Sequence, residues 1–207
     1  MQFQIPIHTG QKTGWFYDHR ENRARLNTLV AGKRVLDIFS YIGGWGIQAA
    51  YHGAESVTCI DSSGPALDQL MQNATLNNVA DRIQTIKQDA FAALDHLATQ
   101  SDKFDVIILD PPALIKRRKD IPAGQRAYQH LNQRALQLLS DKGILVSASC
   151  SLHLAYHELI DIVRKSSIQV ERPVRIFAQG HQGSDHPVHP AIPETNYLKS
   201  LFVSVST

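Results

Sequence analysis

The sequence predicts an α/β fold with a doubly wound, mostly parallel sheet of seven strands that ends in an antiparallel pair. Three observations support this prediction. Short apolar runs alternate with stretches of helical periodicity, which is the pattern of parallel strands joined by crossover helices. Acidic residues follow several of these runs, at the strand ends where open parallel sheets bind ligands. After the fifth run the alternation stops, and two further strands follow without an obvious helix between them.

The first five apolar runs have the length of strands and predict strands at residues 34–39, 56–61, 83–88, 104–110 and 143–149. Apolar residues at three- and four-residue spacing predict amphipathic helices at residues 44–52, 65–77, 91–99, 125–139 and 152–164. Ser63 is the expected N-cap of the second helix, with Pro65 in its first turn. The last two strands are expected at 168–177 and 197–205, and the long loops at 111–124 and 178–195.

Length and composition indicate a single domain. We expect the 207 residues to form a Rossmann-like core at 33–207, preceded by a lid or helix segment at 1–32. Hydrophobic residues make up 43% of the chain, yet no charge-free apolar stretch reaches the roughly 20 residues needed to cross a bilayer. The first residues lack a secretory signal, so a cytoplasmic location is expected. The net charge of +2 does not by itself indicate a nucleic-acid partner.

Four acidic residues stand where predicted strands open into loops. Asp37, Asp61 and Asp89 end or follow the first three strands, and Asp110 begins the rigid sequence Asp110-Pro111-Pro112 at the end of the fourth. Because the carboxyl ends of parallel strands share one edge of a sheet, these carboxylates are expected to surround one ligand crevice. The alternative for each acid taken singly is a helix cap or a solvated loop residue.

The turn after the first strand indicates which ligand the crevice suits. Gly43-Gly44-Trp45-Gly46 lacks the spaced glycines of a dinucleotide fold, which disfavours a nicotinamide cofactor. Its backbone N–H groups suit the carboxylate of an amino acid, as in S-adenosylmethionine, and Asp37 would face the ammonium group. Asp61 would accept the ribose hydroxyls, and Asp89 with the N–H of Ala90 would bind adenine. The expected cofactor-binding residues are Asp37, Phe39, Tyr41, Gly43, Gly44, Asp61, Ser62, Asp89, Ala90 and Asp110.

Several motifs along the chain also resemble a known family. They lie at residues 10–20, 35–44, 109–113, 149–151, 185–187, 193–194 and 197–199. On these residues the chain resembles class I S-adenosylmethionine-dependent methyltransferases, and more narrowly the bacterial large-subunit ribosomal RNA cytosine-5 methyltransferase family. The resemblance implies S-adenosylmethionine as cofactor and ribosomal RNA as substrate. Members usually carry an RNA-binding module ahead of the catalytic domain, so the chain is expected to be a fragment or a minimal member, and a homodimer is left open.

The resemblance makes Cys150 the expected nucleophile. Carbon 5 of cytosine reacts poorly until a thiolate adds at carbon 6. Cys150 follows the fifth strand and is expected directly before a helix, whose dipole would lower its pKa. Asp110 would hydrogen-bond to ring nitrogen 3 of the base or protonate it. The alternative for Cys150 is a small buried apolar side chain, as expected for Cys59, and no residue is identified as the base that removes the carbon-5 proton.

A basic run and a pair of prolines complete the expected site. The run follows the Asp-Pro-Pro turn and would neutralise RNA phosphates, whereas the alternative is a solvated charged surface. The expected substrate-binding residues are Pro111, Pro112, Lys116, Arg117, Arg118 and Lys119. The ten histidines show no complete ligand set of recognised spacing, so no metal is expected.

The sequence leaves two other functions open. Enzymes that methylate nitrogen also use an Asp-Pro-Pro motif, although Ala113 stands where they typically carry an aromatic residue that stacks on the base. The other alternative is a non-catalytic module that binds S-adenosylmethionine or a nucleotide. Every motif position carries the residue expected of an active enzyme, which argues against such a module.

Overall fold

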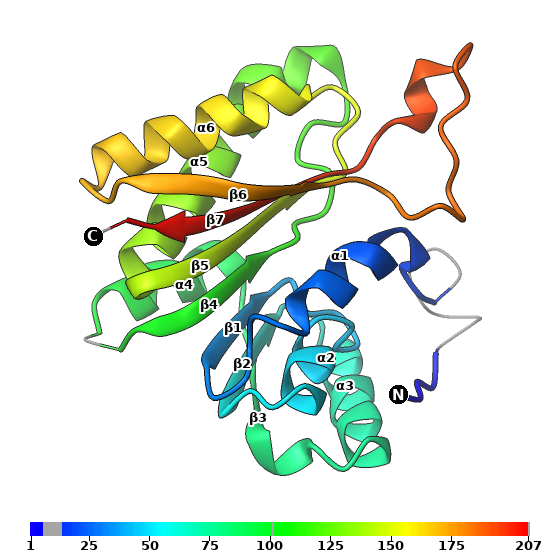
Figure 1. Cartoon of the computed structure of the whole chain (residues 1–207), viewed down its shortest axis with the longest axis vertical. Helices are drawn as coiled ribbons and strands as arrows, with labels where there is room; N and C mark the ends of the chain where they lie inside the picture. The colour runs from blue at the N-terminus through cyan, green and yellow to red at the C-terminus, as the bar shows by residue number, and fades with distance from the viewer. Residues whose placement is uncertain (6–13, 101, 207) are drawn as a thin grey trace.

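The computed structural model describes residues 1–5, 14–100 and 102–206. Its strands are β1 (Arg34–Ile38), β2 (Ser56–Asp61), β3 (Ile83–Lys87), β4 (Phe104–Leu109), β5 (Leu139–Ser149), β6 (Val174–Gly180) and β7 (Lys199–Val205). They form one seven-stranded sheet in the order β3-β2-β1-β4-β5-β7-β6 (Figure 1). The first five strands pair in parallel, and β7 pairs antiparallel with both β5 and β6. The predicted fold class is confirmed, including the antiparallel C-terminal pair.

Helices cover both faces of the sheet. The α-helices are α1 (Arg20–Leu26), α2 (Gly46–Tyr51), α3 (Gly64–Leu76), α4 (Ala90–Ala98), α5 (Ile121–Leu138) and α6 (Tyr156–Gln169). Short 3-10 helices are η1 (Tyr17–His19), η2 (Ala80–Arg82), η3 (Arg118–Asp120) and η4 (Pro193–Thr195). The first three α-helices lie on one face and the last three on the other (Figure 1). Alternate residues of β1 enter the two apolar layers, Val35 on the α2 side and Leu36 on the α5 side, as the pleat requires.

The predicted start of α3 is confirmed by the hydrogen bond at its N-cap. The Ser63 side chain accepts a hydrogen bond from the backbone N–H of Ala66 at 3.3 Å. Pro65 lies in the first turn, where its missing N–H costs nothing. The cap fixes the chain direction directly after Asp61, and so it orients the end of β2 toward the crevice.

The loop expected at 111–124 is shorter than predicted. A 3-10 turn forms at 118–120, and α5 begins at Ile121 because Pro122 fits the first turn of a helix. Gly124 belongs to the helix as well. A side chain there would collide with Ile115, so the glycine allows the loop to pack tightly on α5.

The segment after β5 also differs from prediction. The helix expected at 152–164 begins at Tyr156 and continues to Gln169, so residues 151–155 form a loop. The strand expected at 168–177 is therefore displaced, and β6 begins at Val174. The apolar pattern of Ile168 was misleading, since its side chain is 62% exposed at the end of the helix.

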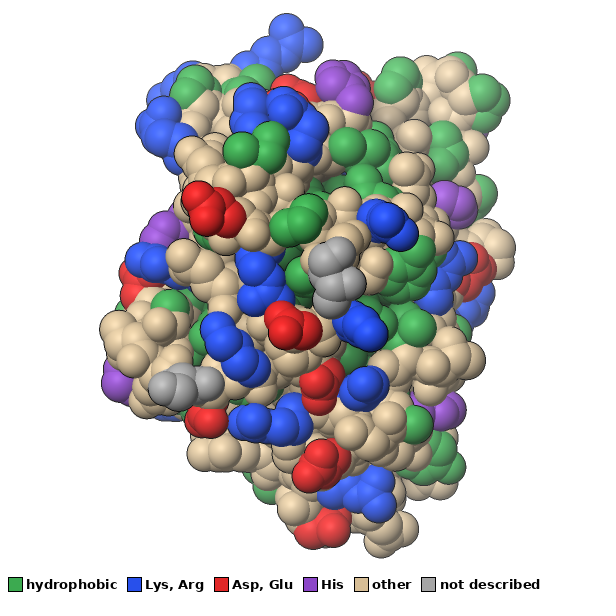
Figure 2. All heavy atoms as spheres, turned by 60° about the vertical axis from the view of Figure 1, so that its left-hand side comes forward, with side chains coloured by type: hydrophobic (Ala, Val, Ile, Leu, Met, Phe, Trp, Pro, Cys, Tyr) green, Lys and Arg blue, Asp and Glu red, His purple; other side chains and the backbone are tan. Residues whose placement is uncertain are grey.

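The surface is mixed in charge. Over the lower half of the face shown in Figure 2, Lys and Arg side chains lie interspersed with Asp and Glu side chains. Exposed pairs such as Arg134 with Asp95 and Lys165 with Asp161 add little stability, because solvent screens them. Among the described residues, no helix is both long and apolar enough to cross a membrane.

Candidate active site

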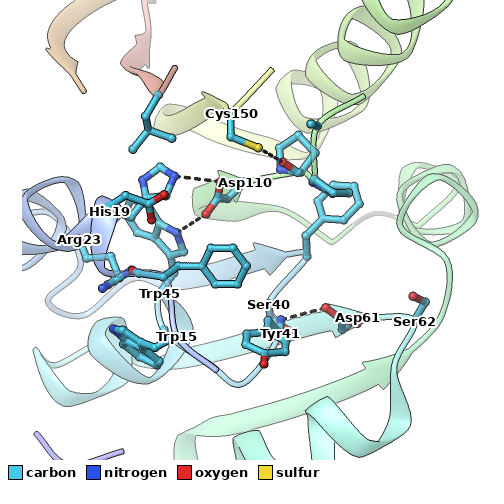
Figure 3. Close-up of a pocket in the computed structure, with 18 residues that line it drawn as sticks. Trp15, His19, Arg23, Ser40, Tyr41, Trp45, Asp61, Ser62, Asp110 and Cys150 are labelled. Atoms are coloured by element: carbon cyan, nitrogen blue, oxygen red, sulfur yellow. Dashed lines mark hydrogen bonds and ion pairs between the residues drawn. The ribbon is translucent and has the colours of Figure 1, made fainter. Parts of the chain in front are cut away.

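A pocket of about 390 Å³ opens at the carboxyl ends of β1, β2, β4 and β5. Cys150 and Asp110 lie at one end of it, and Asp61 and Ser62 lie at the other (Figure 3). The pocket is lined by Trp15, Phe16, Asp18, His19, Arg23, Phe39, Ser40, Tyr41, Gly44, Trp45, Asp61, Ser62, Asp110, Pro111, Pro112, Ala113, Cys150 and Leu198. The structure thus brings together most of the expected cofactor residues and the expected catalytic pair.

Asp37 lies beneath the glycine turn and does not line the pocket. Its side chain is fully buried, and Oδ2 accepts a hydrogen bond from the backbone N–H of Gly46 at 2.9 Å. Burial raises the pKa of Asp37 well above its ordinary value, although the bond from Gly46 opposes the shift. A Cβ on Gly46 would lie 2.5 Å from Cys59 Sγ. Asp37 therefore fixes the turn, and its contact with an ammonium group stays a prediction.

Two aromatic residues at the end of β1 have unusual backbone conformations. Phe39 has a φ of 65° and Tyr41 a φ of 48°, in the left-handed region that costs a bulky residue of order 1–3 kcal/mol. The backbone N–H of Tyr41 donates to Asp61 Oδ2 at 2.9 Å, which holds this conformation. The Tyr41 ring meets the Phe16 ring edge-on, with centroids 5.6 Å apart. The strained turn therefore presents aromatic surface to the pocket.

Asp61 stands at the wall of the pocket with its carboxylate held by backbone donors. Oδ1 accepts from the N–H of Ser63 at 2.8 Å, and Oδ2 accepts from Tyr41. A carboxylate oxygen can accept more than one hydrogen bond, so both oxygens keep capacity for a ligand. Ser62 lies beside it at the pocket edge. This arrangement is suited to accept hydrogen bonds from two neighbouring hydroxyl groups.

Three other expected cofactor residues lie outside the pocket lining. Asp89 is exposed and caps α4, where Oδ1 accepts from the N–H groups of Phe91 at 3.0 Å and Ala92 at 3.2 Å. Ala90 is buried in the first turn of that helix. Gly43, at a φ of 90°, packs against α2 and α3. The helix-cap alternative describes the contacts of Asp89, and the adenine contacts of Asp89 and Ala90 stay predictions.

Asp110 receives donors from two distant segments. Trp45 Nε1 donates to Oδ2 at 3.0 Å, and His19 Nε2 lies 3.1 Å from Oδ1. Burial acts to raise the pKa of Asp110, but His19, Trp45 and the charge of Arg23 outweigh burial and hold the pKa below its ordinary value. Asp110 is therefore ionised at neutral pH. It accepts hydrogen bonds, and the expectation that it protonates a ring nitrogen is not favoured.

His19 is itself oriented by Asn22. The amide Nδ2 of Asn22 donates to the carbonyl of His181 at 3.0 Å, which fixes its orientation, and it lies 3.2 Å from His19 Nδ1. Nδ1 therefore accepts from Asn22, which leaves Nε2 to carry a proton toward Asp110. A side chain on Gly180 would collide with Asn22. The end of β6 thus has room for this array only because residue 180 is glycine.

Cys150 lies in a loop and not at a helix start. The N-cap of α6 is Ala155, so the expected stabilisation of a thiolate by the dipole of a directly following helix is wrong. The Sγ atom faces the carbonyl of Pro111 at 3.9 Å. Figure 3 shows Cys150 and Asp110 at the same end of the pocket.

The loop around Cys150 is clamped on both sides. The Tyr128 hydroxyl lies 2.8 Å from Ser149 Oγ and 3.0 Å from Ser151 Oγ, and both serines are buried. Ser151 Oγ also accepts from the backbone N–H of Ile115 at 3.1 Å. These bonds tie the loop after β4 to the loop after β5. They hold the cysteine and the Asp-Pro-Pro turn in one rigid unit.

The expected basic run lies outside the pocket lining. The side chains of Lys116, Arg117, Arg118 and Lys119 are all exposed. Arg117 pairs with Asp120 at 3.1 Å, and solvent screens this exposed pair. A role of the run in RNA binding stays a prediction.

The segment before β1 supplies pocket residues that the sequence did not single out. Trp15, Asp18, His19 and Arg23 line the pocket, as does Leu198 near the other end of the chain. Phe16 lines it too, whereas Tyr17 is 50% exposed. The family-like segment 10–20 was the available signal, but residues 10–13 lie outside the described part of the chain. Only the fold brings this segment onto the strand ends.

The strand order and pocket define a class of protein, the class I methyltransferase fold. The chain superposes on SMU.776 complexed with SAH with a TM-score of 0.87 and 24% identity, covering 98% of this chain and 53% of that chain. It also superposes on the SAM-dependent methyltransferase from Agrobacterium tumefaciens with a TM-score of 0.69 and 22% identity, covering 94% and 64%. These likenesses establish the fold.

The sequence places the chain in a particular family. It matches the family described as conserved hypothetical protein 95 over residues 20–149, more than half of its length, and it belongs to that family. It is similar to ribosomal RNA large subunit methyltransferase I of Aeromonas salmonicida (strain A449), with 38% identity over 200 residues, 96% of this chain and 50% of that protein. The chain spans about half the length of the curated relatives it matches.

Proposed function

We propose that this chain acts as an S-adenosylmethionine-dependent RNA methyltransferase that forms 5-methylcytosine in ribosomal RNA through a covalent cysteine adduct. The observation that carries the proposal is that Cys150 and Asp110 face one end of the pocket whose other end holds Asp61 (Figure 3). The name of the Aeromonas relative supports ribosomal RNA as the substrate. The SAH bound to SMU.776 supports the cofactor.

The residues of the pocket fit S-adenosylmethionine. Asp61 would hold the ribose hydroxyls, and the aromatic turn of Phe39 and Tyr41 would contact the adenosine. Arg23 is buried beside the glycine turn, where its guanidinium stacks over Trp15 at 5.0 Å. Its charge complements the carboxylate that the N–H groups of the turn were expected to bind. When bound, the cofactor supplies an electrophilic methyl group.

The chain's own residues would act on the base. The Cys150 thiolate forms a bond from Sγ to carbon 6, and the electron pair of the carbon 5–carbon 6 double bond becomes available at carbon 5 for the methyl group. Asp110, held ionised by His19 and Trp45, accepts an N–H of the exocyclic amine and orients the ring. A base then takes the carbon-5 proton, the double bond re-forms, and the bond between Sγ and carbon 6 breaks to return the thiolate.

Removal of the thiol tests this reaction. With labelled cofactor and bulk ribosomal RNA, the unaltered chain should yield labelled 5-methylcytidine on nucleoside analysis. Cys150→Ala should lower the rate by about 10³-fold or more, because the nucleophile is lost. Cys59→Ala is the matched control, since Cys59 is buried under the glycine turn and should not affect transfer strongly. RNA that contains 5-fluorocytidine should form a denaturation-resistant complex with the unaltered chain alone.

A second candidate is methylation of an exocyclic amine. The ionised state of Asp110 favours this second reaction, because a carboxylate can accept a hydrogen bond from an amine without any thiol. A labelled nitrogen-methylated nucleoside that persists in Cys150→Ala would overturn the cytosine-5 proposal. Tight binding of SAH with no methyl transfer to any RNA would instead support a non-catalytic module.

A further inference from the structure

Lys199 is a buried cation that takes no part in the reaction steps proposed above. It opens β7, and its Cα pairs with that of Ser149 across the antiparallel β5–β7 ladder. Its side chain is only 6% exposed. An ammonium group removed from water in this way needs compensation by hydrogen bonds and by a negative charge.

The hydrogen bonds of Lys199 point to the cysteine loop. Nζ donates to the carbonyls of Ser151 and Leu154, both at 2.8 Å. These are neutral acceptors in the loop that directly follows Cys150. Within the described part of the chain, no carboxylate lies within 4.0 Å of Nζ, so its charge has no carboxylate partner at contact distance.

Two acidic groups, Cys150 and Glu158, are close enough for their charges to affect the pKa of Lys199. Glu158 is already engaged, because its carboxylate accepts from the N–H of Ala155 at 2.6 Å and from Gln125 at 3.0 Å. Burial lowers the pKa of Lys199, and the charge of Cys150 opposes that shift more strongly than the charge of Glu158 does. The attraction between two charges is reciprocal, so the ammonium group favours a thiolate at Cys150.

We propose that Lys199 is the counter-ion that holds Cys150 as a thiolate in the resting site. This inference rests on the nucleophile role proposed for Cys150. Tyr128 from α5 and Tyr197 before β7 also feel the charge of Cys150, but neither is a cation. Asp110 shares the pocket and opposes a second negative charge there, and its own charge is offset by Arg23. Lys199 thus takes the role that a helix dipole was expected to perform.

The ion pair also bears on the release of product. When Sγ is bonded to carbon 6 it carries no charge, and the buried ammonium loses its compensation. Expulsion of the thiolate restores the pair, so Lys199 favours the breaking of the bond between Sγ and carbon 6. A thiol of low pKa is in addition the better leaving group.

The pH dependence of alkylation tests the ion pair without RNA or cofactor. The chain is treated with iodoacetamide over a range of pH, and mass spectrometry follows modification at Cys150. The midpoint should lie below the roughly 8.5 of an ordinary thiol. Lys199→Gln keeps N–H donors for the two carbonyls but removes the charge, and it should raise the midpoint by about one pH unit or more. Lys199→Arg, the matched control, keeps the charge and should retain most of the depression.

Two results would overturn the proposal. A midpoint at or above about 8.5 in the unaltered chain does so without any variant, whatever the folding of the variants. An unchanged midpoint in a folded Lys199→Gln chain, checked by thermal unfolding, does so as well. A depressed midpoint in a chain that transfers no methyl group would keep the ion pair and reject the proposed reaction.

Discussion

Asp37 and Asp110 stand at the ends of two neighbouring parallel strands, yet their carboxyl groups have opposite environments. Asp37 is completely buried and accepts a hydrogen bond from the backbone N–H of Gly46. Burial dominates and raises its pKa. Asp110 keeps a side-chain exposure of 20%, faces His19 and Trp45, and has a lowered pKa. One acid supports the turn from below, and the other faces the pocket.

The comparison shows that the donors around a carboxylate decide its charge more than its position on a strand does. Both residues satisfy the same sequence pattern, an acid at the end of an apolar run. His19 and Arg23, which make Asp110 an anion, come from the segment before β1. A carboxylate with two donors and a nearby guanidinium is an acceptor at neutral pH.

The largest expected effect separates the two acids by activity. Asp110→Asn should lower methyl transfer by about 10²–10³-fold, because the amide cannot accept from both His19 and Trp45 and no longer carries a charge. Asp37→Asn should stay within about threefold of the unaltered chain, since the amide oxygen can still accept from Gly46. Initial rates at saturating RNA and cofactor measure both. Equal losses of methyl-transfer rate in the two variants would contradict the different roles given to the two acids.

A smaller effect concerns the packing around Asp37. Gly46→Ala should destabilise the fold by about 1–3 kcal/mol, because the new Cβ would lie 2.5 Å from Cys59 Sγ and 3.1 Å from Asp37 Oδ2. Gly44→Ala is the control, since a Cβ there meets Trp15 at an ordinary 3.4 Å, and its cost should stay within about 0.5 kcal/mol. Urea unfolding measures both. A Gly46→Ala chain as stable as the control would show that the turn is loosely packed.

The smallest effect is the pH dependence of stability. The raised pKa of Asp37 means that the folded state keeps a proton which the unfolded state releases, so this contribution is lost as the pH rises from about 4 through the folded pKa. Asp37→Asn should remove this loss, flatten the profile and raise stability at pH 8 by about 1 kcal/mol or more. The lowered pKa of Asp110 changes the pH dependence of stability in the opposite direction. Its stabilisation is present above the ordinary Asp pKa and is lost only as the pH falls through the lower folded value.

Urea midpoints at several pH values would check this third prediction. An Asp37→Asn profile parallel to that of the unaltered chain would place the Asp37 carboxyl in contact with water, contrary to its complete burial.

The fold could be predicted from sequence because its signals are local. Each parallel strand is a short apolar run, and the cap at Ser63 is visible from its own neighbours. The clustering of Asp61, Asp110 and Cys150 followed from the rule that strand ends meet at one edge. The antiparallel C-terminal pair followed from the loss of helical rhythm.

The failures have a common physical cause. A contact such as that of His19 with Asp110, or of Lys199 with the loop after Cys150, joins segments far apart in the chain. No local pattern encodes such contacts. The start of α6 was misjudged because Leu152 and Leu154 continue an apolar rhythm, although Leu154 is buried in the loop itself. Helix periodicity reports which side chains are buried, and a loop clamped from both sides buries them too.

Gly180 closes β6, the outermost strand of the sheet, and a glycine in an edge strand is ordinarily an entropic burden. Here the missing methyl group leaves the space that Asn22 occupies while it orients His19. A larger side chain at residue 180 should therefore displace Asn22 and disturb the position of His19. A fusion partner or an added strand that displaced the end of β6 would disturb the contact between Asn22 and His19 from outside the pocket.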